Sequence, residues 1–157
     1  RFFKKLTLSL REETINLDLK SLKIFCEDVS LNLRKGDIIC LSGELGSGKT
    51  TFARNLINSI FKINKLEKPL SIKSPSFPIL ITYEVTNFEI YHYDLYRISK
   101  SSELDEINIF EELNNSITLI EWPEIIMEQL KAYNFYSLDL IIKDENTRIV
   151  KHNLIFN

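Results

Sequence analysis

The sequence reads Gly43-Glu44-Leu45-Gly46-Ser47-Gly48-Lys49-Thr50 at positions 43–50. This stretch fits G-x-x-x-x-G-K-[ST], the phosphate-binding loop (P-loop) of nucleotide hydrolases and kinases. In such a loop, backbone N–H groups converge on phosphate oxygens, and glycine permits the backbone angles that this convergence needs. We therefore expect Lys49 to reach the β- and γ-phosphates, the Thr50 hydroxyl to bind Mg²⁺, and a helix to begin there.

The residues around the loop supply the context that a P-loop requires. The apolar run Asp37-Ile38-Ile39-Cys40-Leu41 before it is typical of a strand buried in a parallel sheet. After it, Phe52, Leu56 and Ile60 recur at helical spacing. The four glycines of the chain all lie here, at Gly36, Gly43, Gly46 and Gly48. The alternative is a glycine-rich turn without a ligand, which this strand–loop–helix order disfavours.

Length and composition limit the class of protein. With 157 residues and 44% hydrophobic content, residues 1–157 suit a single domain with a substantial core. A formal charge of -2 argues against a surface that binds nucleic acid by itself. Cys26 and Cys40 stand in no CxxC pattern and are interpreted as reduced core residues. Without an apolar run of ~20 residues, we expect a soluble cytoplasmic protein with no membrane contact.

The first third of the chain gives a mixed pattern. Residues 3–10 alternate like a strand, and Ser9 with Glu12 has capping-box spacing that could open a helix. We predict that Ile15–Leu33 is mainly helical, although Leu17 and Leu19 alternate like a strand. The helical face consists of Leu22, Cys26, Val29 and Leu33.

The segment Ser74-Pro75-Ser76-Phe77-Pro78 carries hydroxyls beside a rigid proline. Ser76 is either part of a switch loop ordered by a γ-phosphate or Mg²⁺, or part of a strand-entry turn, and residue type alone does not decide. Lysines between residues 61 and 73 are interpreted as a solvated loop rather than a phosphate or RNA site.

Two β-rich runs follow, Ile79–Val85 and Phe88–Tyr93, separated by the two residues of a tight hairpin. The second run ends in Asp94. We expect this carboxylate to end a strand beside the P-loop strand, where P-loop enzymes hold magnesium, although a simple cap is the alternative. His92 is interpreted as a packed strand residue, not a metal ligand.

A short helix is predicted after Ser102, capped by Ser102 with Asp105 and continuing to Leu113. Ile117–Ile120 then forms an apolar strand that ends in Glu121, and Pro123 at a first helical position begins another helix. Glu121 thus lies at a strand-to-helix junction, at the sheet edge where ligands bind.

The end of the chain, Phe135–Ile142 with Arg148–Phe156, is predicted to be a hairpin that completes the sheet. Arg148 could approach a nucleotide, but a surface arginine on this hairpin is the simpler interpretation. These elements predict an α/β, P-loop NTPase-like three-layer fold with a mixed, partly parallel central sheet and hairpin edge strands.

With these motifs in order, the chain resembles the TsaE family, the ATPases of bacterial tRNA threonylcarbamoyladenosine biosynthesis. The resemblance covers nearly the whole chain and rests on four segments: Gly43 to Phe52, Ser74-Pro75-Ser76-Phe77, His92-Tyr93-Asp94-Leu95-Tyr96-Arg97 and Leu119-Ile120-Glu121-Trp122-Pro123-Glu124. The P-loop alone is unspecific, whereas the Asp-Leu-Tyr-Arg and Glu-Trp-Pro-Glu segments together are quite specific.

The resemblance implies a Mg²⁺-dependent, ATP-hydrolysing subunit that assists the TsaD and TsaB proteins in modifying position 37 of tRNA, and that meets tRNA only through that complex. It implies catalytic roles for Lys49, Asp94 and Glu121, and metal binding by Thr50, Glu121 and Asp94. It also implies nucleotide binding by the segment Gly43, Glu44, Leu45, Gly46, Ser47, Gly48, Lys49, Thr50 and Thr51. Trp122 is expected to pack beside the site.

We hypothesise that water attacks the γ-phosphate, with Glu121 orienting the water or hydrated metal and Asp94 holding the metal shell. Sequence alone leaves these two acidic roles interchangeable. We expect hydrolysis to be slow without partners, since no arginine finger stands in the motifs and Arg97 is more simply a salt-bridging residue after Asp94.

The main alternative is a non-catalytic nucleotide switch in which ATP orders residues 74–77 into a docking surface. A transporter-type ATPase is suggested by Val29–Asp37 leading into the P-loop, but the chain is short and has no LSGGQ-like signature. A small-molecule kinase is also open, although the sequence offers no arginine-rich lid.

Overall fold

The apolar run before the P-loop forms the central strand β2 (Ile38–Ser42), whose first four residues are buried. In the computed structural model, which describes residues 11–156, β2 pairs in parallel with β5 (Ser116–Glu121) and with β6 (Phe135–Ile142). A strand covered on both faces and both edges is apolar throughout rather than alternating. The segment that enters the P-loop is therefore enclosed in the interior of the sheet.

The complete sheet has seven strands in the order β1-β7-β6-β2-β5-β4-β3. β4 (Phe88–Asp94) is parallel to β5, and β3 (Leu80–Val85) is its antiparallel hairpin partner at one edge. β7 (Arg148–His152) pairs antiparallel with β6. β1 (Glu13–Leu17) covers the outer side of β7, so the C-terminal hairpin is not an edge. The predicted mixed, partly parallel sheet is confirmed.

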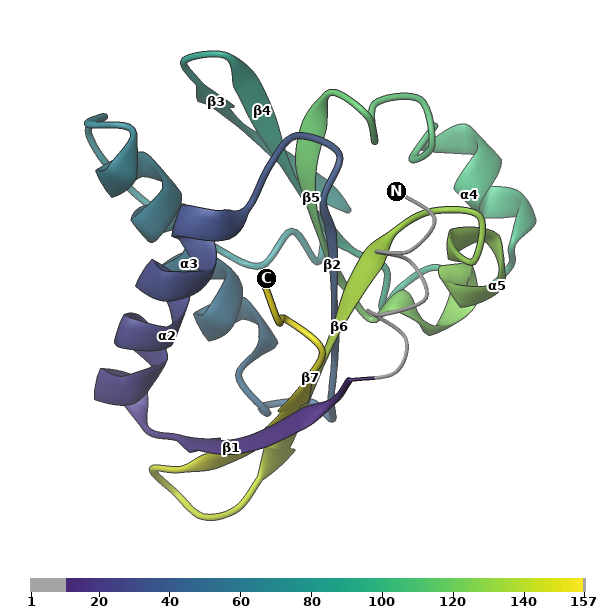
Figure 1. The fold of residues 1–157 in the computed structure, drawn as a ribbon. Coiled ribbons are helices and arrows are strands. Elements are labelled where there is room, and N and C mark those ends of the chain that lie inside the picture. Colours follow the sequence, from purple (N-terminus) through teal and green to yellow (C-terminus); the bar gives the residue numbers. More distant parts are fainter. Residues whose placement is uncertain (1–10, 157) are drawn as a thin grey trace.

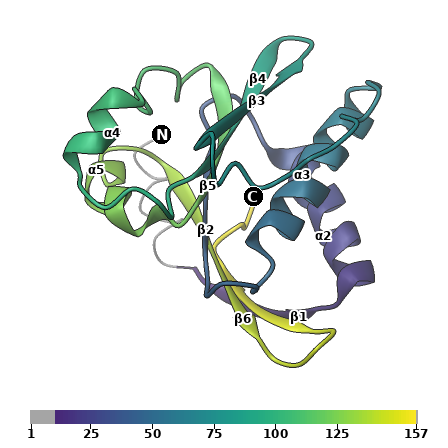
Figure 2. The same ribbon diagram turned by 180° about the vertical axis from the view of Figure 1, so that it is seen from behind.

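Helices cover both faces of this sheet, which confirms the predicted three layers. α2 (Leu19–Asn32) and α3 (Lys49–Ile63) lie on one face. The other face carries α4 (Ser102–Glu106), the 3-10 helix η1 (Pro123–Ile126) and α5 (Met127–Leu130). Figures 1 and 2 show the two groups of helices on opposite sides of the strands.

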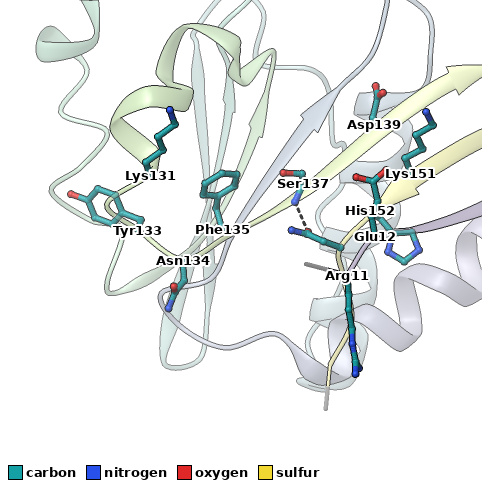
Figure 3. Close-up of a pocket in the computed structure, with 11 residues that line it drawn as sticks. Arg11, Glu12, Lys131, Tyr133, Asn134, Phe135, Ser137, Asp139, Lys151 and His152 are labelled. Atoms are coloured by element: carbon teal, nitrogen blue, oxygen red, sulfur yellow. Dashed lines mark hydrogen bonds between the residues drawn. The ribbon is translucent and has the colours of Figure 1, made fainter. Parts of the chain in front are cut away.

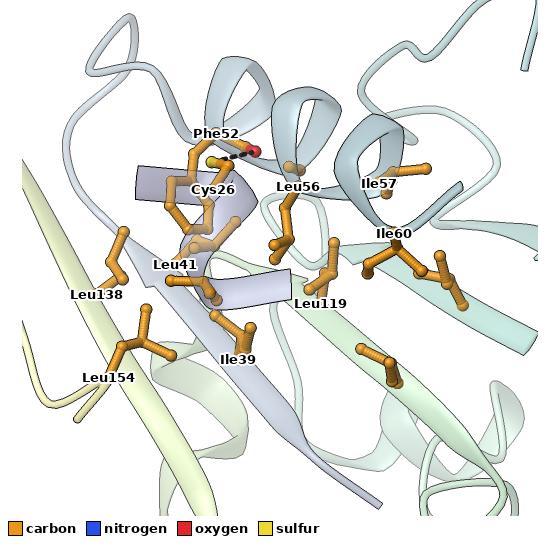
Figure 4. Packing of buried hydrophobic residues seen from close by; sticks show 14 of the residues in the cluster. Cys26, Ile39, Leu41, Phe52, Leu56, Ile57, Ile60, Leu119, Leu138 and Leu154 are labelled. Atoms are coloured by element: carbon orange, nitrogen blue, oxygen red, sulfur yellow. Dashed lines mark hydrogen bonds between the residues drawn. The ribbon is translucent and has the colours of Figure 1, made fainter. Parts of the chain in front are cut away.

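The core between α3 and the sheet is tightly apolar. Phe52, Leu56 and Ile60, which define the predicted helical stripe, are at most 1% exposed. Figure 4 shows them facing Ile39 and Leu41 of β2 and Leu119 of β5. Burial of this stripe, at about 1.5–3 kcal/mol for each large side chain, fixes the start of α3 against the carboxyl end of β2.

The prediction that residues 15–33 are mainly helical was partly wrong, because residues 13–17 form β1. The expected strand of residues 3–10 and the expected capping box at Ser9 lie outside the described residues. The helix begins only after Asp18, whose carboxylate accepts a 2.7 Å hydrogen bond from the N–H of Ser21. The Ser21 hydroxyl in turn accepts from the N–H of Asp18 at 2.9 Å. This reciprocal capping box stops the strand and starts α2.

The helix predicted from Ser102 to Leu113 is only five residues long. Asn108 adopts φ +49°, a left-handed conformation that ends helices. The buried side chains beyond α4 are Ile109 and Leu113, which anchor an irregular segment instead of a helical stripe. The start of α4 has no side-chain cap, so the expected cap of Ser102 with Asp105 is absent; the Glu103 carboxylate instead accepts from the N–H of Lys100, just before the helix, at 2.9 Å.

Cys26 and Cys40 are buried free thiols, as predicted. Burial raises the pKa of Cys40 to about 12, so this thiol stays protonated and unreactive at neutral pH. Among residues 11–156, every helix is too short or too polar to cross a lipid bilayer.

Of the four glycines, the first glycine of the loop leaves the least room for a side chain. Gly43 has φ +143°, and a Cβ atom there would lie 2.5 Å from the carbonyl oxygen of Leu140 and 2.5 Å from Oγ of Ser47. Replacing Gly43 should therefore push the P-loop away from β6.

We expect Gly43→Ala to lower the free energy of unfolding by roughly 3 kcal/mol, from backbone strain and overpacking together. Gly46→Ala is the matched control, because Gly46 has φ +79° but no atom within 4 Å of an added Cβ. The control should lose only about 1 kcal/mol, the backbone cost alone. Denaturant unfolding measures both, and equal losses in the two variants would contradict the steric argument.

Candidate functional site

Three parallel strands bring the candidate residues to one edge of the sheet. β2 runs into the P-loop, β5 ends at Glu121, and β4 ends at Asp94. Glu121 is in register with Leu41 of β2 on one side and with Asp94 on the other. The strand beside the P-loop strand is thus β5, and the expectation that Asp94 ends this neighbouring strand was wrong. Asp94 lies one strand farther away.

A cavity of about 400 Å³ opens at this edge. It brings Lys49, Thr50, Asp94 and Glu121 together, as predicted, with Trp122 beside them. Its lining also includes Leu45, Gly46, Gly48, Thr51, Ser74, Ser76 and Tyr96. The other members of the predicted nucleotide-binding segment are not part of this lining, but each accepts a hydrogen bond from Nζ of Lys49: Gly43, Glu44 and Ser47.

Lys49 is held by its own loop. Its Nζ donates to the carbonyl oxygens of Gly43 at 2.6 Å and Glu44 at 2.9 Å, and lies 4.0 Å from the ring centroid of Trp122. Burial lowers the pKa of Lys49, while the nearby carboxylates of Glu121 and Asp94 act in the opposite direction. The ammonium is therefore partly desolvated and lines the cavity, where an anion would compete for it.

Trp122 takes this position because its backbone turns sharply after β5. Its φ and ψ are +56° and +58°, and Pro123 then starts η1 at the predicted first helical position. The Trp122 ring lies 4.8 Å from the ring of Tyr96. The expected packing of Trp122 beside the site is thus present.

Glu121 is the most enclosed charged group of the site, at 2% exposure. The hydroxyl of Thr50 lies 3.0 Å from both of its carboxylate oxygens. Nε2 of His92 lies 2.8 Å from Oε1 of the same carboxylate. The carboxylate is thereby oriented from two sides, toward the first turn of α3.

His92 is packed within its strand and fully buried, as predicted, but its contact with Glu121 was missed. The available signal was its place two residues before Asp94, since alternate residues of a strand lie on the same face of the sheet. A polar residue inside the apolar run Phe88–Tyr93 also needs a partner.

Asp94 is held from a different direction. Its Oδ2 accepts from the Ser74 hydroxyl at 2.6 Å, and its Oδ1 accepts from the N–H of Tyr96 at 3.0 Å. Ser74, and not Ser76, thus attaches the proline-containing segment to the carboxylate. Ser76 lines the cavity and is exposed, in a turn that leads into β3, so both interpretations of this residue stand.

The two candidate arginines differ from expectation. Within residues 11–156, no ion pair joins Arg97 to Asp94; the Arg97 guanidinium instead lies 5.2 Å from the ring centroid of Phe77. Arg148 is not a free surface arginine, because its Nε donates to the carbonyl oxygen of Ser47 at 2.9 Å. It therefore contacts the P-loop from the side opposite the carboxylates.

Two further cavities bear on where a ligand fits. One of about 450 Å³ lies between the start of α2 and the β6–β7 hairpin, and shares Gly48 and Thr51 with the site cavity. Another, of about 490 Å³, is lined by the amino-terminal half of β6 with neighbouring charged residues of both signs (Figure 3). This last cavity contains none of the predicted site residues.

The donor atoms suit a hard cation without forming a complete cage. Among residues 11–156, no three His, Cys, Asp or Glu side chains converge as a metal site. Thr50, Glu121 and Asp94 offer one hydroxyl and two carboxylates around one cavity. Mg²⁺ is held in this way in nucleotide sites, by one or two protein groups together with waters and phosphates.

Comparison with known proteins identifies relatives along most of the chain. A family model described as "Threonylcarbamoyl adenosine biosynthesis protein TsaE" matches residues 17–150. A tRNA threonylcarbamoyladenosine biosynthesis protein TsaE from Rickettsia typhi is 40% identical, over 92% of this chain and 97% of its own. The protein of the same name from Aquifex aeolicus is 30% identical, over 94% of each chain.

A solved structure shares the fold. The crystal structure of Bacillus subtilis YdiB superposes with a TM-score of 0.64, at 21% identity, over 90% of this chain and 84% of that chain.

We expect His92→Leu to lower the free energy of unfolding by about 1–3 kcal/mol, because the buried Glu121 carboxylate loses one of its partners. His92→Gln is the matched variant, since its side-chain amide can reach the same oxygen and should recover much of the loss. Chemical denaturation of both variants tests this. A Leu variant as stable as the unsubstituted chain would show that the contact contributes nothing.

Proposed function

The chain belongs to the TsaE family of tRNA threonylcarbamoyladenosine biosynthesis, and from this premise we propose that it binds ATP with Mg²⁺ and hydrolyses it to support that modification at position 37. The observation that carries the proposal is the hydroxyl of Thr50, placed 3.0 Å from both oxygens of a buried Glu121 at the start of the P-loop helix. Family membership disfavours the transporter and metabolite-kinase alternatives.

The paired cavities support a nucleotide as the ligand. Phosphates would lie against the P-loop, where the N-terminus of α3 and the backbone N–H groups favour negative charge. The cavity on the far side of Gly48 and Thr51 has apolar walls from Leu17, Leu22 and Val150, which suit a nucleobase. One elongated molecule would thus fill both cavities across the residues they share.

The site residues divide the work of phosphoryl transfer by position. Lys49 would leave the carbonyls of its loop for the phosphate oxygens, and Thr50 with Glu121 and Asp94 would hold Mg²⁺. The ion, when bound, neutralises charge on the β- and γ-phosphates. Glu121 is the carboxylate next to Thr50, so we assign to it the orientation of the attacking water and to Asp94 the outer part of the metal shell.

The attack exchanges one phosphorus–oxygen bond for another. The water oxygen bonds to the γ-phosphorus, the bond to the β–γ bridging oxygen breaks, and ADP and phosphate leave. Glu121 would accept the hydrogen bond from the water, and His92 would keep the carboxylate aimed at it. Enclosure of this carboxylate strengthens both contacts.

Partner proteins are needed in this proposal, because no arginine finger is found in the lining of the site cavity within residues 11–156. Among the described residues, Lys49 is the only cationic side chain of that lining. We propose that TsaD- and TsaB-like proteins complete the site and that tRNA is met only through them, in the cytoplasm. The exposed Leu45, Phe77 and Tyr96 provide apolar surface around the cavity mouth for such docking.

A non-catalytic switch remains the second candidate, on one specific observation. The Ser74 hydroxyl donates to Asp94 at 2.6 Å. Any ligand that binds this carboxylate would compete with that hydrogen bond and so would move the segment of residues 74–78. Tight ATP binding without turnover, in the presence of partners, would favour this candidate.

The deciding experiment measures ATP turnover by the purified chain, alone and with a TsaD–TsaB pair and unmodified tRNA. We expect slow turnover alone and a clear increase with the partners. An unchanged rate would remove the proposed role of the partners in completing the site. No turnover in either condition would leave the switch.

We expect Glu121→Gln to retain ATP binding but to lose turnover by ~10²-fold or more, as when a positioned acid/base group is removed. Glu124→Gln is the matched control, because Glu124 is exposed three residues farther along the chain. Calorimetric binding and steady-state hydrolysis separate the two effects. Undiminished turnover in Glu121→Gln would reject the assigned role.

A further inference from the structure

Arg148 contacts the P-loop from the β6–β7 hairpin, about a hundred residues away in the chain. Its Nε donates to the carbonyl oxygen of Ser47 at 2.9 Å, and its Nη2 to that of Gly46 at 3.4 Å. Its Nη1 donates to the carbonyl oxygens of Asp144 at 2.9 Å and Thr147 at 3.1 Å. The guanidinium therefore joins two backbone segments, the P-loop and the hairpin turn.

These contacts use the Arg148 side chain for hydrogen bonds within the protein. A guanidinium carries five N–H donors in a planar fork, and Arg148 directs its nitrogens to four carbonyl oxygens. Little donor capacity is left for a ligand, although Arg148 also lines the cavity next to Gly48. Its effect on a bound nucleotide is thus exerted through the loop.

The bonded carbonyls determine where the loop amides point. In a trans peptide the C=O and the following N–H point in opposite directions, so a carbonyl fixed toward Arg148 turns the next N–H away from it. Fixing the carbonyl of Ser47 in this way sets the direction of the N–H of Gly48, the residue that precedes α3. That N–H then faces the side of the loop where phosphates would lie.

The hairpin turn that carries Arg148 is itself well fixed. The Asp144 carboxylate accepts from the N–H groups of Asn146 at 2.9 Å and Thr147 at 2.8 Å. The N–H of Lys143 closes the turn on the carbonyl oxygen of Thr147 at 3.2 Å. In Figure 1 this hairpin and the loop between β2 and α3 lie at the same, lower edge of the sheet. Arg148 therefore ties the loop to a rigid support.

We propose that Arg148 is a positioning residue for nucleotide binding, which holds the P-loop in its binding-competent shape by fixing the carbonyls of Gly46 and Ser47 from behind. This inference rests on the proposed function, because it takes the P-loop to be the phosphate site. It adds the hairpin of β6 and β7 to the parts of the chain that determine nucleotide affinity.

The test is calorimetric titration of the intact chain with ADP and with Mg²⁺ plus ATP, comparing Arg148→Ala with the unsubstituted chain. We expect the Kd of Arg148→Ala to rise roughly tenfold, which corresponds to about 1.4 kcal/mol. Guanidinium chloride, at concentrations well below those that unfold the protein, should restore part of the affinity by occupying the vacated position. A general loss of stability would not be reversed in this way.

Two further variants separate geometry from charge. Arg148→Lys keeps the charge but not the fork, so it should stay weakened. Lys143→Ala removes a charge from the other end of the same exposed turn, and its Kd should stay within about twofold of the unsubstituted chain, as surface changes usually do. If Arg148→Ala is too unstable to titrate, Arg148→Lys decides the matter.

Several outcomes overturn the inference. Unchanged affinity in Arg148→Ala would show that the loop keeps its shape without the arginine, and unchanged affinity in Arg148→Lys would show that charge alone suffices. A loss in Lys143→Ala equal to that in Arg148→Ala would likewise make the effect one of long-range charge. If the unsubstituted chain binds neither nucleotide, the proposed function itself fails, and this result is distinct from the others.

Discussion

A buried carboxylate governs the arrangement of the site. Glu121 ends the strand between β2 and β4, at 2% exposure, and enclosing such a charge is costly unless it is hydrogen-bonded. Thr50 from α3 and His92 from β4 supply the bonds, so the helix start and two strands are fixed relative to one another by the needs of one side chain. The apolar stripe of α3 holds Thr50 in place for this contact, and the parallel pairing of β4 and β5 does the same for His92.

Before any ligand arrives, the charges of the site are already matched within the protein. Lys49 bonds the carbonyls of Gly43 and Glu44, and Asp94 bonds Ser74 and the N–H of Tyr96. Binding of a nucleotide with its metal would therefore exchange partners rather than create contacts from nothing. Such an exchange limits the net gain in affinity, because each new bond replaces one that the free protein already has.

The sequence predicted the fold where the signal is local, and missed features set by distant pairing. The P-loop, β2 and α3 follow from glycine positions and apolar spacing within about 25 residues. That β5 rather than β4 lies beside β2 depends on long-range strand pairing, which local pattern does not encode. The short α4 depends on the left-handed backbone of Asn108, and β1 on pairing with β7, at the far end of the chain.

The residues of the candidate site likewise fall into those that local sequence predicted and those that depend on tertiary contacts. Lys49, Thr50, Asp94 and Glu121 were predicted from motif and strand ends, and the structure brings them to one cavity. The contacts of His92 and Ser74 were missed: the position of His92 indicates that it shares a face with Asp94 but not which carboxylate lies opposite, and a serine beside a proline has the same local signature with or without a carboxylate opposite. Arg148 was underestimated for a related reason: a hairpin arginine is usually solvated, and only the tertiary fold shows the loop carbonyls within its reach.

The separation of 101 residues between Arg148 and Ser47 has a consequence for biosynthesis. Chains emerge from the ribosome N-terminus first, so the phosphate loop is made long before the arginine that braces it and before β6, which flanks β2. Contacts of such high sequence separation form late, because bringing distant residues together costs chain entropy. A nascent chain would thus carry the complete phosphate-loop sequence without its brace, and the loop would take its final shape only after the β6–β7 hairpin has been made and has docked.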